Sequence, residues 1–96
     1  MDAAPKYQFN PRNLDAIAGR LVMLRSAMGM SQREFADAAG IATNTYNQYE
    51  KAKSRPELDK AILICDRFQV TLDWLYFGEI AGLPYHVTER LRAAAV

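Results

Sequence analysis

Residues 31–50 read SQREFADAAGIATNTYNQYE, a stretch in which two short helices and the turn between them can be located. Ser31 and Glu34 form the pattern of a capping box, in which each side chain accepts a hydrogen bond from a backbone amide at the start of a helix. Gly40 is the residue type best able to adopt the left-handed conformation that ends a helix. The pattern then predicts a second helix over residues 43–50. A turn of only three residues, beginning at Gly40, separates the two helices.

The segments on both sides of this stretch predict further helices. Upstream, apolar residues recur at helical spacing until Gly29: Leu14, Ile17, Leu21, Leu24 and Met28. Downstream, Pro56 suits the first turn of a fourth helix, whose predicted apolar stripe is Leu58, Ile62, Cys65 and Phe68. After a break at residues 69–70, Thr71 can cap a fifth helix that Gly78 ends and whose apolar residues are Leu72, Trp74 and Leu75.

The last segment carries a further apolar stripe. Its members are Leu83, Val87 and Leu91, preceded by Tyr76, Phe77 and Ile80. The stripe can form a contact between two copies of the chain or fold back on the bundle, and the dimer contact is the preferred interpretation. The chain is accordingly divided into a flexible N-terminal arm (residues 1–13), a helical domain (14–79) and a C-terminal extension that serves as a dimerisation helix (80–96).

The composition is typical of one small folded domain. The chain has 96 residues, of which 50% are hydrophobic and 24% charged. Because Cys65 is the single cysteine and His86 the single histidine, an internal disulfide and a zinc site are excluded. No apolar run is long enough to span a bilayer, and the N-terminus lacks the pattern of a signal peptide. We therefore expect a protein of the reducing cytoplasm with no membrane association and no cofactor.

Three stretches within residues 17–78 match, in order and spacing, the segments of a known family. They read RLVMLRSAMGMSQREFADAAGI, TNTYNQYEK and RPELDKAILICDRFQVTLDWLYFG. In this the chain resembles the Cro/phage-repressor (Xre-type) helix-turn-helix family. The resemblance implies an all-α fold, a five-helix lambda-repressor-like DNA-binding bundle with a short C-terminal extension that can add a sixth helix. It also implies a transcriptional repressor that binds double-stranded DNA, as a homodimer on an inverted repeat.

Two positions depart from the family pattern. The turn position that often carries Ser or Thr is Ala42, so that either Thr43 takes over the cap or the helix starts without one. The glycine that usually follows the Glu-x pair at the end of the recognition helix is Ala52. This second change leaves the backbone conformation of residues 51–55 open.

Helical geometry separates the recognition helix into two faces. At about 100° per residue, Tyr46, Tyr49 and Glu50 cluster on one side. The opposite side carries the predicted base-reading residues: Asn44, Asn47 and Gln48, with Thr43 and Thr45 at the borders. Asn and Gln can pair with adenine in the major groove, and a Thr methyl can pack on a thymine methyl. Because this face lacks Arg and Lys, we expect A·T pairs to dominate the bases read, unless the face is simply a solvated surface.

Phosphate contacts are predicted beside this helix. The net charge is only +1, but the basic residues outnumber the acidic ones between Lys6 and Arg55. The resemblance implies a phosphate contact for Gln32, where helix N-terminal amides also favour an anion. The other predicted phosphate-binding residues are Arg33, Lys51, Lys53, Ser54 and Arg55, with Arg12 as a weaker candidate.

The remaining residues with distinctive chemistry are assigned structural roles. Glu50 is expected to cap or pair within the domain, because phosphates would repel its carboxylate. Cys65 is expected to be a small buried apolar residue and His86 a surface residue. The aromatic side chains are expected to form core: Phe35, Tyr46, Tyr49, Phe68 and Trp74.

Two other classes of function were weighed. An enzyme is excluded because the sequence has no phosphate-binding glycine loop, metal cluster or nucleophile–base pair. A protein-binding module, or an antitoxin-type partner protein, that has kept the fold remains the alternative to DNA binding, since the recognition helix lacks Arg and Lys.

Overall fold

The described residues, 13–95 of a computed structural model, are all-helical. Their six helices are α1 (Leu14–Ala27), α2 (Gln32–Ala39), α3 (Thr43–Glu50), α4 (Leu58–Phe68), α5 (Leu72–Phe77) and α6 (Tyr85–Ala94). The predicted all-α bundle is thereby confirmed, and the sixth helix is present. Of the arm predicted for residues 1–13, only Asn13 is described, and its side chain caps α1 by accepting a hydrogen bond from the Ala16 amide at 2.8 Å.

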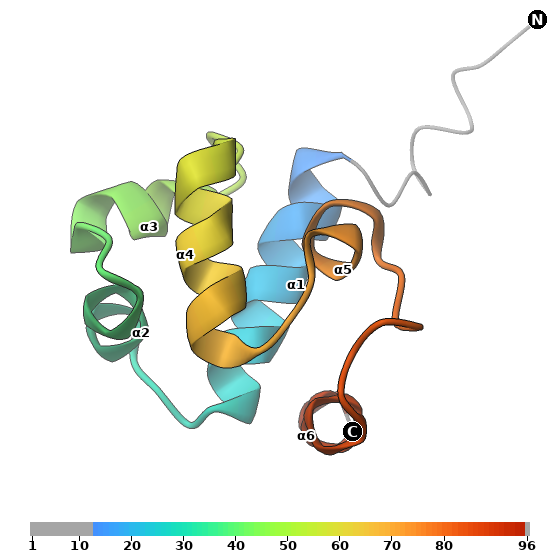
Figure 1. The fold of residues 1–96 in the computed structure, drawn as a ribbon. Helices are drawn as coiled ribbons and strands as arrows, with labels where there is room; N and C mark the ends of the chain where they lie inside the picture. The colour runs from blue at the N-terminus through green and yellow to red at the C-terminus, as the bar shows by residue number, and fades with distance from the viewer. Residues whose placement is uncertain (1–12, 96) are drawn as a thin grey trace, which may run out of the picture.

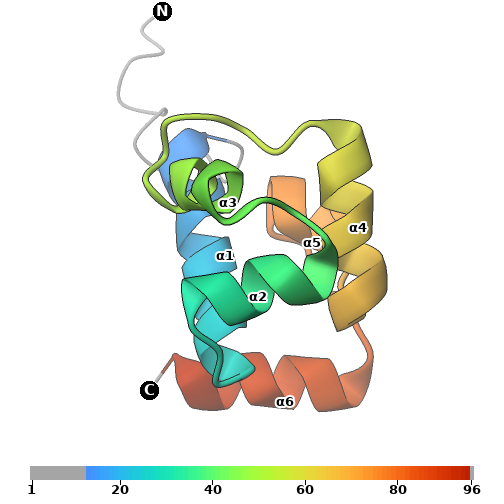
Figure 2. The ribbon, with the colours of Figure 1, turned by 90° about the vertical axis from the view of Figure 1, so that its left-hand side faces the viewer.

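The helices are arranged around α1 (Figure 1). It contacts α3, α5 and α6, whereas α4 contacts α2 and α5. Figure 2 shows α2 and α3 on one side of the bundle, with α6 crossing the end that lies farthest from α3. The helix-turn-helix and the C-terminal helix therefore occupy different parts of the surface.

Local signals place the ends of α2 and α5 where they were predicted. The Ser31 and Glu34 side chains make both hydrogen bonds of the capping box of α2. Thr71 caps α5 by accepting from the Trp74 amide at 3.0 Å. Gly40 and Gly78 end α2 and α5 in the left-handed conformation. The residues that determine these helix ends lie within about four positions of them, because a capping side chain reaches only the nearest backbone amides.

The core is a continuous apolar cluster with aromatic rings at its centre. The α1 residues Ile17, Leu21 and Leu24 are buried, as their spacing predicted. The ring of Phe35 stacks on that of Phe68, with centroids 4.2 Å apart, and lies 4.9 Å from that of Tyr46. Burying a side chain of this size contributes about 1.5–3 kcal/mol. The five aromatic residues assigned to the core are all buried there: Phe35, Tyr46, Tyr49, Phe68 and Trp74.

The predicted stripe of α4 is wrong at two of its four positions. Cys65 and Phe68 are buried, but Leu58 is 55% and Ile62 39% exposed. Their places are taken by Ala61 and Ile64, so that the buried face of α4 consists of Ala61, Ile64, Cys65 and Phe68.

The start of α4 also differs from the prediction. Pro56 is buried and precedes the helix instead of forming its first turn. Glu57 is the cap, accepting from the Lys60 amide at 2.8 Å. A carboxylate that accepts this bond stabilises the positive N-terminal end of the helix.

The stripe of the C-terminal extension folds back on the bundle, which is the alternative to the preferred dimer contact. Leu83, Val87 and Leu91 are all buried in the common core. Helix α6 packs on α1 through this face. A dimer contact through the stripe would expose these side chains first, and the chain instead covers its own α1 with them.

Cys65 and His86 take the structural roles expected of them. Cys65 is a free, buried thiol whose pKa burial raises to about 11. His86 is exposed, and its Nε2 lies 2.9 Å from Oε1 of Gln69, the left-handed residue that ends α4.

The loop after α3 contains an alanine in a backbone conformation that favours glycine. Ala52 has a φ of 59°. Its amide donates to the Tyr49 carbonyl at 3.1 Å, and the Lys53 amide donates to the Gln48 carbonyl at 3.0 Å. This pair of bonds is a Schellman motif, which satisfies carbonyls at the end of α3. The departure from the family's glycine therefore leaves the turn intact.

We predict that Ala52→Gly raises the free energy of unfolding by about 1 kcal/mol, because the Cβ atom is disfavoured at positive φ. Chemical denaturation followed by circular dichroism measures the change. Ala93→Gly, at an exposed position within α6, is the control and should lower stability by up to about 1 kcal/mol. A loss of stability in Ala52→Gly would contradict the strain inferred from the backbone.

Candidate nucleic-acid interface

Helices α2 and α3 form a helix-turn-helix with a turn of three residues. Gly40 adopts φ 78°, and the Ile41 amide then donates to the Ala36 carbonyl at 2.9 Å. The Ile41 side chain is buried, which anchors the turn to the core. Ala42 occupies the cap position of α3 and Thr43 is the first helical residue, so α3 starts without a side-chain cap.

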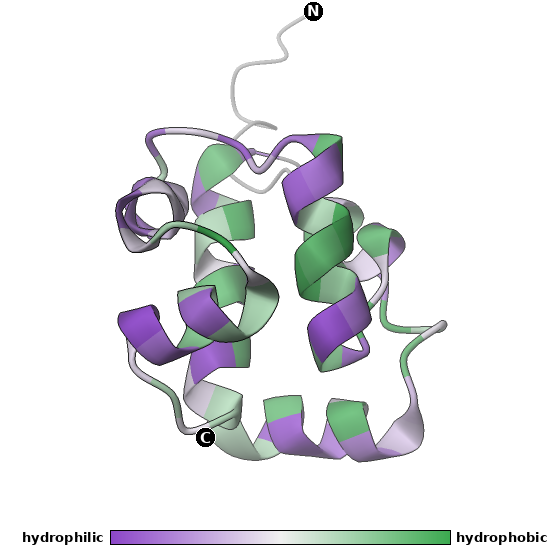
Figure 3. Cartoon of the chain, turned by 60° about the vertical axis from the view of Figure 1, so that its left-hand side comes forward, coloured by the Kyte–Doolittle hydropathy of each residue, from purple (hydrophilic) through white to green (hydrophobic). Residues whose placement is uncertain are grey.

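The two faces predicted for α3 are present. Tyr46 and Tyr49 are buried, whereas Asn44 and Gln48 are exposed. The other three predicted base-reading residues are half-buried: Thr43, Thr45 and Asn47. Figure 3 shows that hydrophilic residues also predominate in the loop that follows α3. The structure thus presents Asn44 and Gln48 most openly to a partner.

Glu50 is the centre of a polar cluster beneath α3. Its carboxylate accepts hydrogen bonds from Arg25 Nε at 2.6 Å and from Arg25 Nη2 at 3.0 Å. The Tyr46 hydroxyl donates to it at 2.5 Å, and Gln32 Nε2 donates at 2.8 Å. The Glu50 side chain is only 5% exposed and that of Arg25 22%. The structural role expected for Glu50 is therefore confirmed, and the bidentate pair with Arg25 ties α3 to α1.

The ionisation of these groups follows from their contacts. Burial acts most strongly on the Glu50 carboxyl and by itself would raise its pKa, but the hydrogen bonds from Arg25, Tyr46 and Gln32 outweigh it, so that the pKa is lowered. Burial and the bond to Glu50 raise the pKa of Tyr46. Glu50 is consequently held as a carboxylate and Tyr46 as a neutral donor.

Gln32 connects this cluster to Asn47, one of the predicted base-reading residues. While its Nε2 donates to Glu50, its Oε1 accepts from Asn47 Nδ2 at 2.9 Å. Both the nitrogen and the oxygen of the Gln32 side-chain amide are therefore hydrogen-bonded within the domain. The bond to Gln32 also holds the Asn47 side chain in one orientation on α3. The two predicted contacts, Gln32 to phosphate and Asn47 to a base, belong to side chains that also position α3 against α2.

The remaining predicted phosphate contacts lie around α3 on exposed residues. The exposed members of the loop are Lys51, Lys53, Ser54 and Arg55. Arg33 is exposed on α2, with its Nε 3.9 Å from Asp37. The weaker candidate Arg12 lies outside the described residues. Loop and helix thus form one polar, partly basic surface next to the predicted base-reading residues.

Arg25 is the residue of this site that the sequence reasoning missed. Arg25 is not part of the apolar stripe predicted for the first helix, and no role was predicted for it. A signal was present, because Arg25 follows Leu21 by four residues and so lies only about 40° from it around the helix. That spacing marks Arg25 as a border residue whose head group can reach a neighbouring helix.

The geometry defines a class of protein, a helix-turn-helix domain with a polar second helix. Residues 21–75 match the model of the helix-turn-helix family. The chain belongs to this family of transcriptional regulators, of the Cro/phage-repressor (Xre) type. Its members are not enzymes, which agrees with the exclusion made from the sequence.

Curated relatives support the family assignment. The chain is 32% identical to the uncharacterized HTH-type transcriptional regulator YobD of Bacillus subtilis, over 58% of this chain and 50% of that protein. It is 30% identical to the cryptic phage CTXphi transcriptional repressor RstR of Vibrio cholerae, over 62% and 53%. It is 40% identical to the HTH-type transcriptional regulator AnsR of Bacillus subtilis, over 66% and 51%.

The matches leave part of each relative uncovered. The chain spans about half the length of these curated relatives. No solved structure gives a significant match to the chain. Among residues 13–95, no helix is long and apolar enough to cross a membrane.

Proposed function

We propose that the chain is a repressor that reads double-stranded DNA with α3 in the major groove. The observation that carries the proposal is the exposure of Asn44 and Gln48 on α3, directly after the turn from a capped α2. Carboxamide side chains at such positions can make two hydrogen bonds each to adenine. Thr43, Thr45 and Asn47 flank them on the same helix, and we propose that all five contribute to base reading in an A·T-containing site.

The neighbouring residues support the backbone part of the same interface. Lys51, Lys53, Ser54 and Arg55 are proposed to contact phosphates, and Gln32 and Arg33 to do so from the start of α2. Such contacts set the position of a protein on DNA and supply most of the non-specific affinity. A regulator of this kind acts in the cytoplasm, at the nucleoid.

We further propose that two copies bind an inverted repeat, as helix-turn-helix proteins commonly do. Since the stripe of α6 is buried, the contact between copies must use other residues. Among the described residues, the large apolar side chains that stay exposed include Leu58, Ile62, Leu63, Phe77, Ile80 and Tyr85.

Selection from a random DNA pool tests the proposal. Purified protein is incubated with random duplexes at physiological salt, and the retained DNA is sequenced. Enrichment of an inverted repeat that contains A·T pairs would support a dimeric, sequence-specific regulator. Absence of enrichment from folded protein would favour the alternative, a protein-binding or antitoxin-type module that has kept the fold.

The phosphate contacts make a separate prediction. Lys53→Ala and Arg55→Ala should each weaken binding to all DNA sequences alike. Each variant should also reduce the steepness of the plot of log K against log[salt] by about 0.9 for the lost phosphate contact. Binding at several salt concentrations measures this slope. Arg90→Ala, on α6 at the far end of the bundle (Figure 2), is the control that should leave the slope unchanged. Loss of preference at a single base pair would contradict the phosphate role.

A further inference from the structure

The outer face of α4 is open to solvent. Helix α4 packs on α2 and α5 through its buried side, and the outer face consists of the exposed residues Asp59, Ile62, Leu63, Asp66 and Arg67. Leu63 is 41% and Ile62 39% exposed. Figure 3 shows hydrophilic residues near each end of α4 and hydrophobic residues in its middle. The outer face therefore combines an apolar centre with charged ends.

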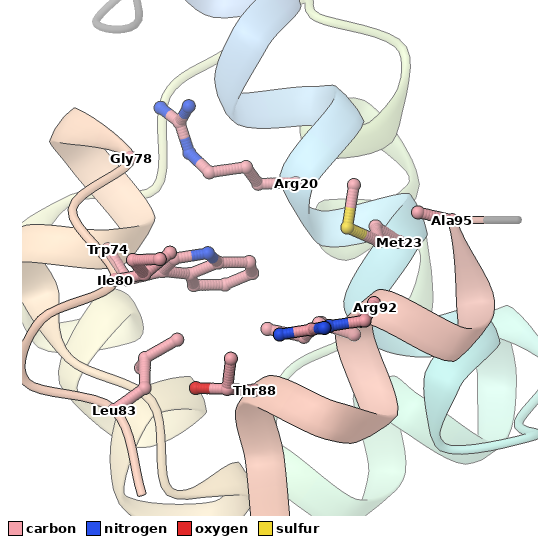
Figure 4. Close-up of a pocket in the computed structure, with 10 residues that line it drawn as sticks. Arg20, Met23, Trp74, Gly78, Ile80, Leu83, Thr88, Arg92 and Ala95 are labelled. Atoms are coloured by element: carbon pink, nitrogen blue, oxygen red, sulfur yellow. The ribbon is translucent and has the colours of Figure 1, made fainter. Parts of the chain in front are cut away.

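A second region with exposed apolar residues is concave and lies elsewhere. A cavity of about 420 Å³ is formed between α1, α5 and α6, with Trp74 of α5 projecting into it (Figure 4). Ile80, which is 61% exposed, lines this cavity, and no residue of α4 does. The outer face of α4 is therefore a separate surface, formed by one helix.

Three residues of the outer face form one row along the helix. Residues four positions apart are neighbours on the surface of an α-helix, so Asp59, Leu63 and Arg67 follow one another. The row carries a negative charge at its N-terminal end, an apolar residue at its centre and a positive charge at its C-terminal end. When the row is reversed, each charge meets its opposite. The row is thus complementary to a second copy of itself.

Neither charge of this row is neutralised by a residue between Asn13 and Ala95. The ion pairs of that part of the chain lie on α1, α2, α3 and α6. The Arg67 guanidinium lies 5.2 Å from the centroid of the Phe68 ring, a contact that positions the arginine but leaves its charge in place. Asp59 and Arg67 can therefore each pair with an opposite charge on another molecule.

A two-fold axis that crosses α4 at Leu63 sets this row against its own copy. The commonest class of helix packing aligns the rows of residues four apart on both helices. In an antiparallel pair of this kind, Leu63 packs beside Leu63 of the other copy, and each Asp59 lies next to Arg67 of the other copy. Because a two-fold contact uses the same patch twice, one complementary row provides two ion pairs.

The same axis keeps both recognition helices on one side of the pair. In Figure 1, α4 lies in front of α1, and α3 lies to the left of α4. A half-turn about a line that crosses α4 from left to right leaves α3 of the second copy on the same left-hand side. Two copies joined in this way can present both α3 helices to one duplex, as an inverted repeat requires.

We propose that two copies of the chain meet through α4, as an antiparallel pair centred on Leu63 with an ion pair between Asp59 and Arg67 at each end. The inference deepens the proposed function and rests on it, because it names the surface that joins the two copies on DNA. A single helix face buries less than the about 1,200 Å² of a stable interface, so the pair is weak in solution and is completed on adjacent half-sites.

Charge reversal tests this interface without DNA. Sedimentation equilibrium at up to about 1 mM protein should show a reversible monomer–dimer equilibrium of the wild type. Asp59→Arg brings two arginines together at each end of the pair, and Arg67→Asp brings two aspartates together. Each variant should weaken self-association by about tenfold or more. Asp15→Arg, the same charge change in the first turn of α1, is the control and should associate like wild type.

A mixture of the two single variants gives the sharpest result. When Asp59→Arg pairs with Arg67→Asp, opposite charges face each other again at both ends. An equimolar mixture should therefore form heterodimers with close to the wild-type affinity, and this recovery would also show that both variants are folded. The chain that carries both substitutions should self-associate for the same reason.

Three outcomes would overturn the proposal, with circular dichroism used to confirm that the variants are folded. They are a wild type that stays monomeric over the whole concentration range, single variants that associate as strongly as wild type, and a mixture that associates no better than its components. Each would leave the proposed reading of DNA standing, because a monomer retains α3. Conversely, a chain that follows the charge-reversal pattern but enriches no DNA would support this interface and contradict the DNA-reading function.

Discussion

Glu50→Ala is expected to lower the free energy of unfolding by about 3 kcal/mol, because it leaves the partly buried Arg25 without its counter-charge. It also removes the acceptor of the Tyr46 hydroxyl and of the Gln32 amide, and a polar group left unpaired in the interior is costly. Chemical denaturation followed by circular dichroism measures the change.

Glu89→Ala is the matched control for this variant. Glu89 pairs with Arg92 at 3.4 Å, but on the surface, where the Arg92 side chain is 72% exposed. Exposed pairs of this kind contribute about 0–1 kcal/mol. If the two alanine variants lose the same stability, the cluster around Glu50 does not hold α3 to α1.

The Glu50 cluster also predicts a dependence of stability on pH. The pKa of Glu50 is lower in the folded chain than its ordinary value of about 4.3. Its stabilising contribution is therefore fully present above that value and is lost as the pH falls through the lower, folded-state pKa. Below about pH 5, wild type should lose more stability than Glu50→Gln, whose side chain does not titrate. Parallel pH profiles of the two would contradict this.

Asn44→Ala combined with Gln48→Ala is expected to reduce affinity for the selected DNA site by about a hundredfold. Each carboxamide that pairs with a base contributes about 1–3 kcal/mol of discrimination, and about 1.4 kcal/mol corresponds to a factor of ten. Affinity for non-specific DNA should stay unchanged, because phosphate contacts supply it. Competition between labelled specific duplex and random duplex measures both.

The double variant is expected to fold, because both side chains are exposed and neither contributes to the Glu50 cluster. Glu89→Ala on α6 again serves as the control and should leave the affinity for the selected site unchanged. If sequence preference survives in a folded double variant, α3 does not read bases through these two residues.

Asn47→Ala should behave differently from the double variant, because Asn47 donates to Gln32 and is half-buried. Its loss frees the Gln32 amide and relaxes the angle between α2 and α3. The base-reading role assigned to Asn47 from its position on the helix is thus joined to a positioning role that only the folded chain reveals.

The sequence by itself determined the helices and the motif. The capping box at Ser31, the left-handed glycines at 40 and 78 and the cap at Thr71 each act over about four residues, so their effect can be read locally. The two faces of α3 follow from helical geometry in the same way. Together with the family resemblance, these signals were sufficient to predict the bundle and the exposure of Asn44 and Gln48.

Only the tertiary structure decided which helix faces are covered. The spacing of Leu58 and Ile62 is compatible with a core stripe, yet α4 turns Ala61 and Ile64 inward, and α6 packs on α1. Likewise, Arg25 meets Glu50 across 25 positions of sequence. Which helix faces are buried, and which side chains pair, depends on how helices distant in the sequence pack on one another. This packing balances many side-chain contacts at once, and no local sequence pattern specifies it.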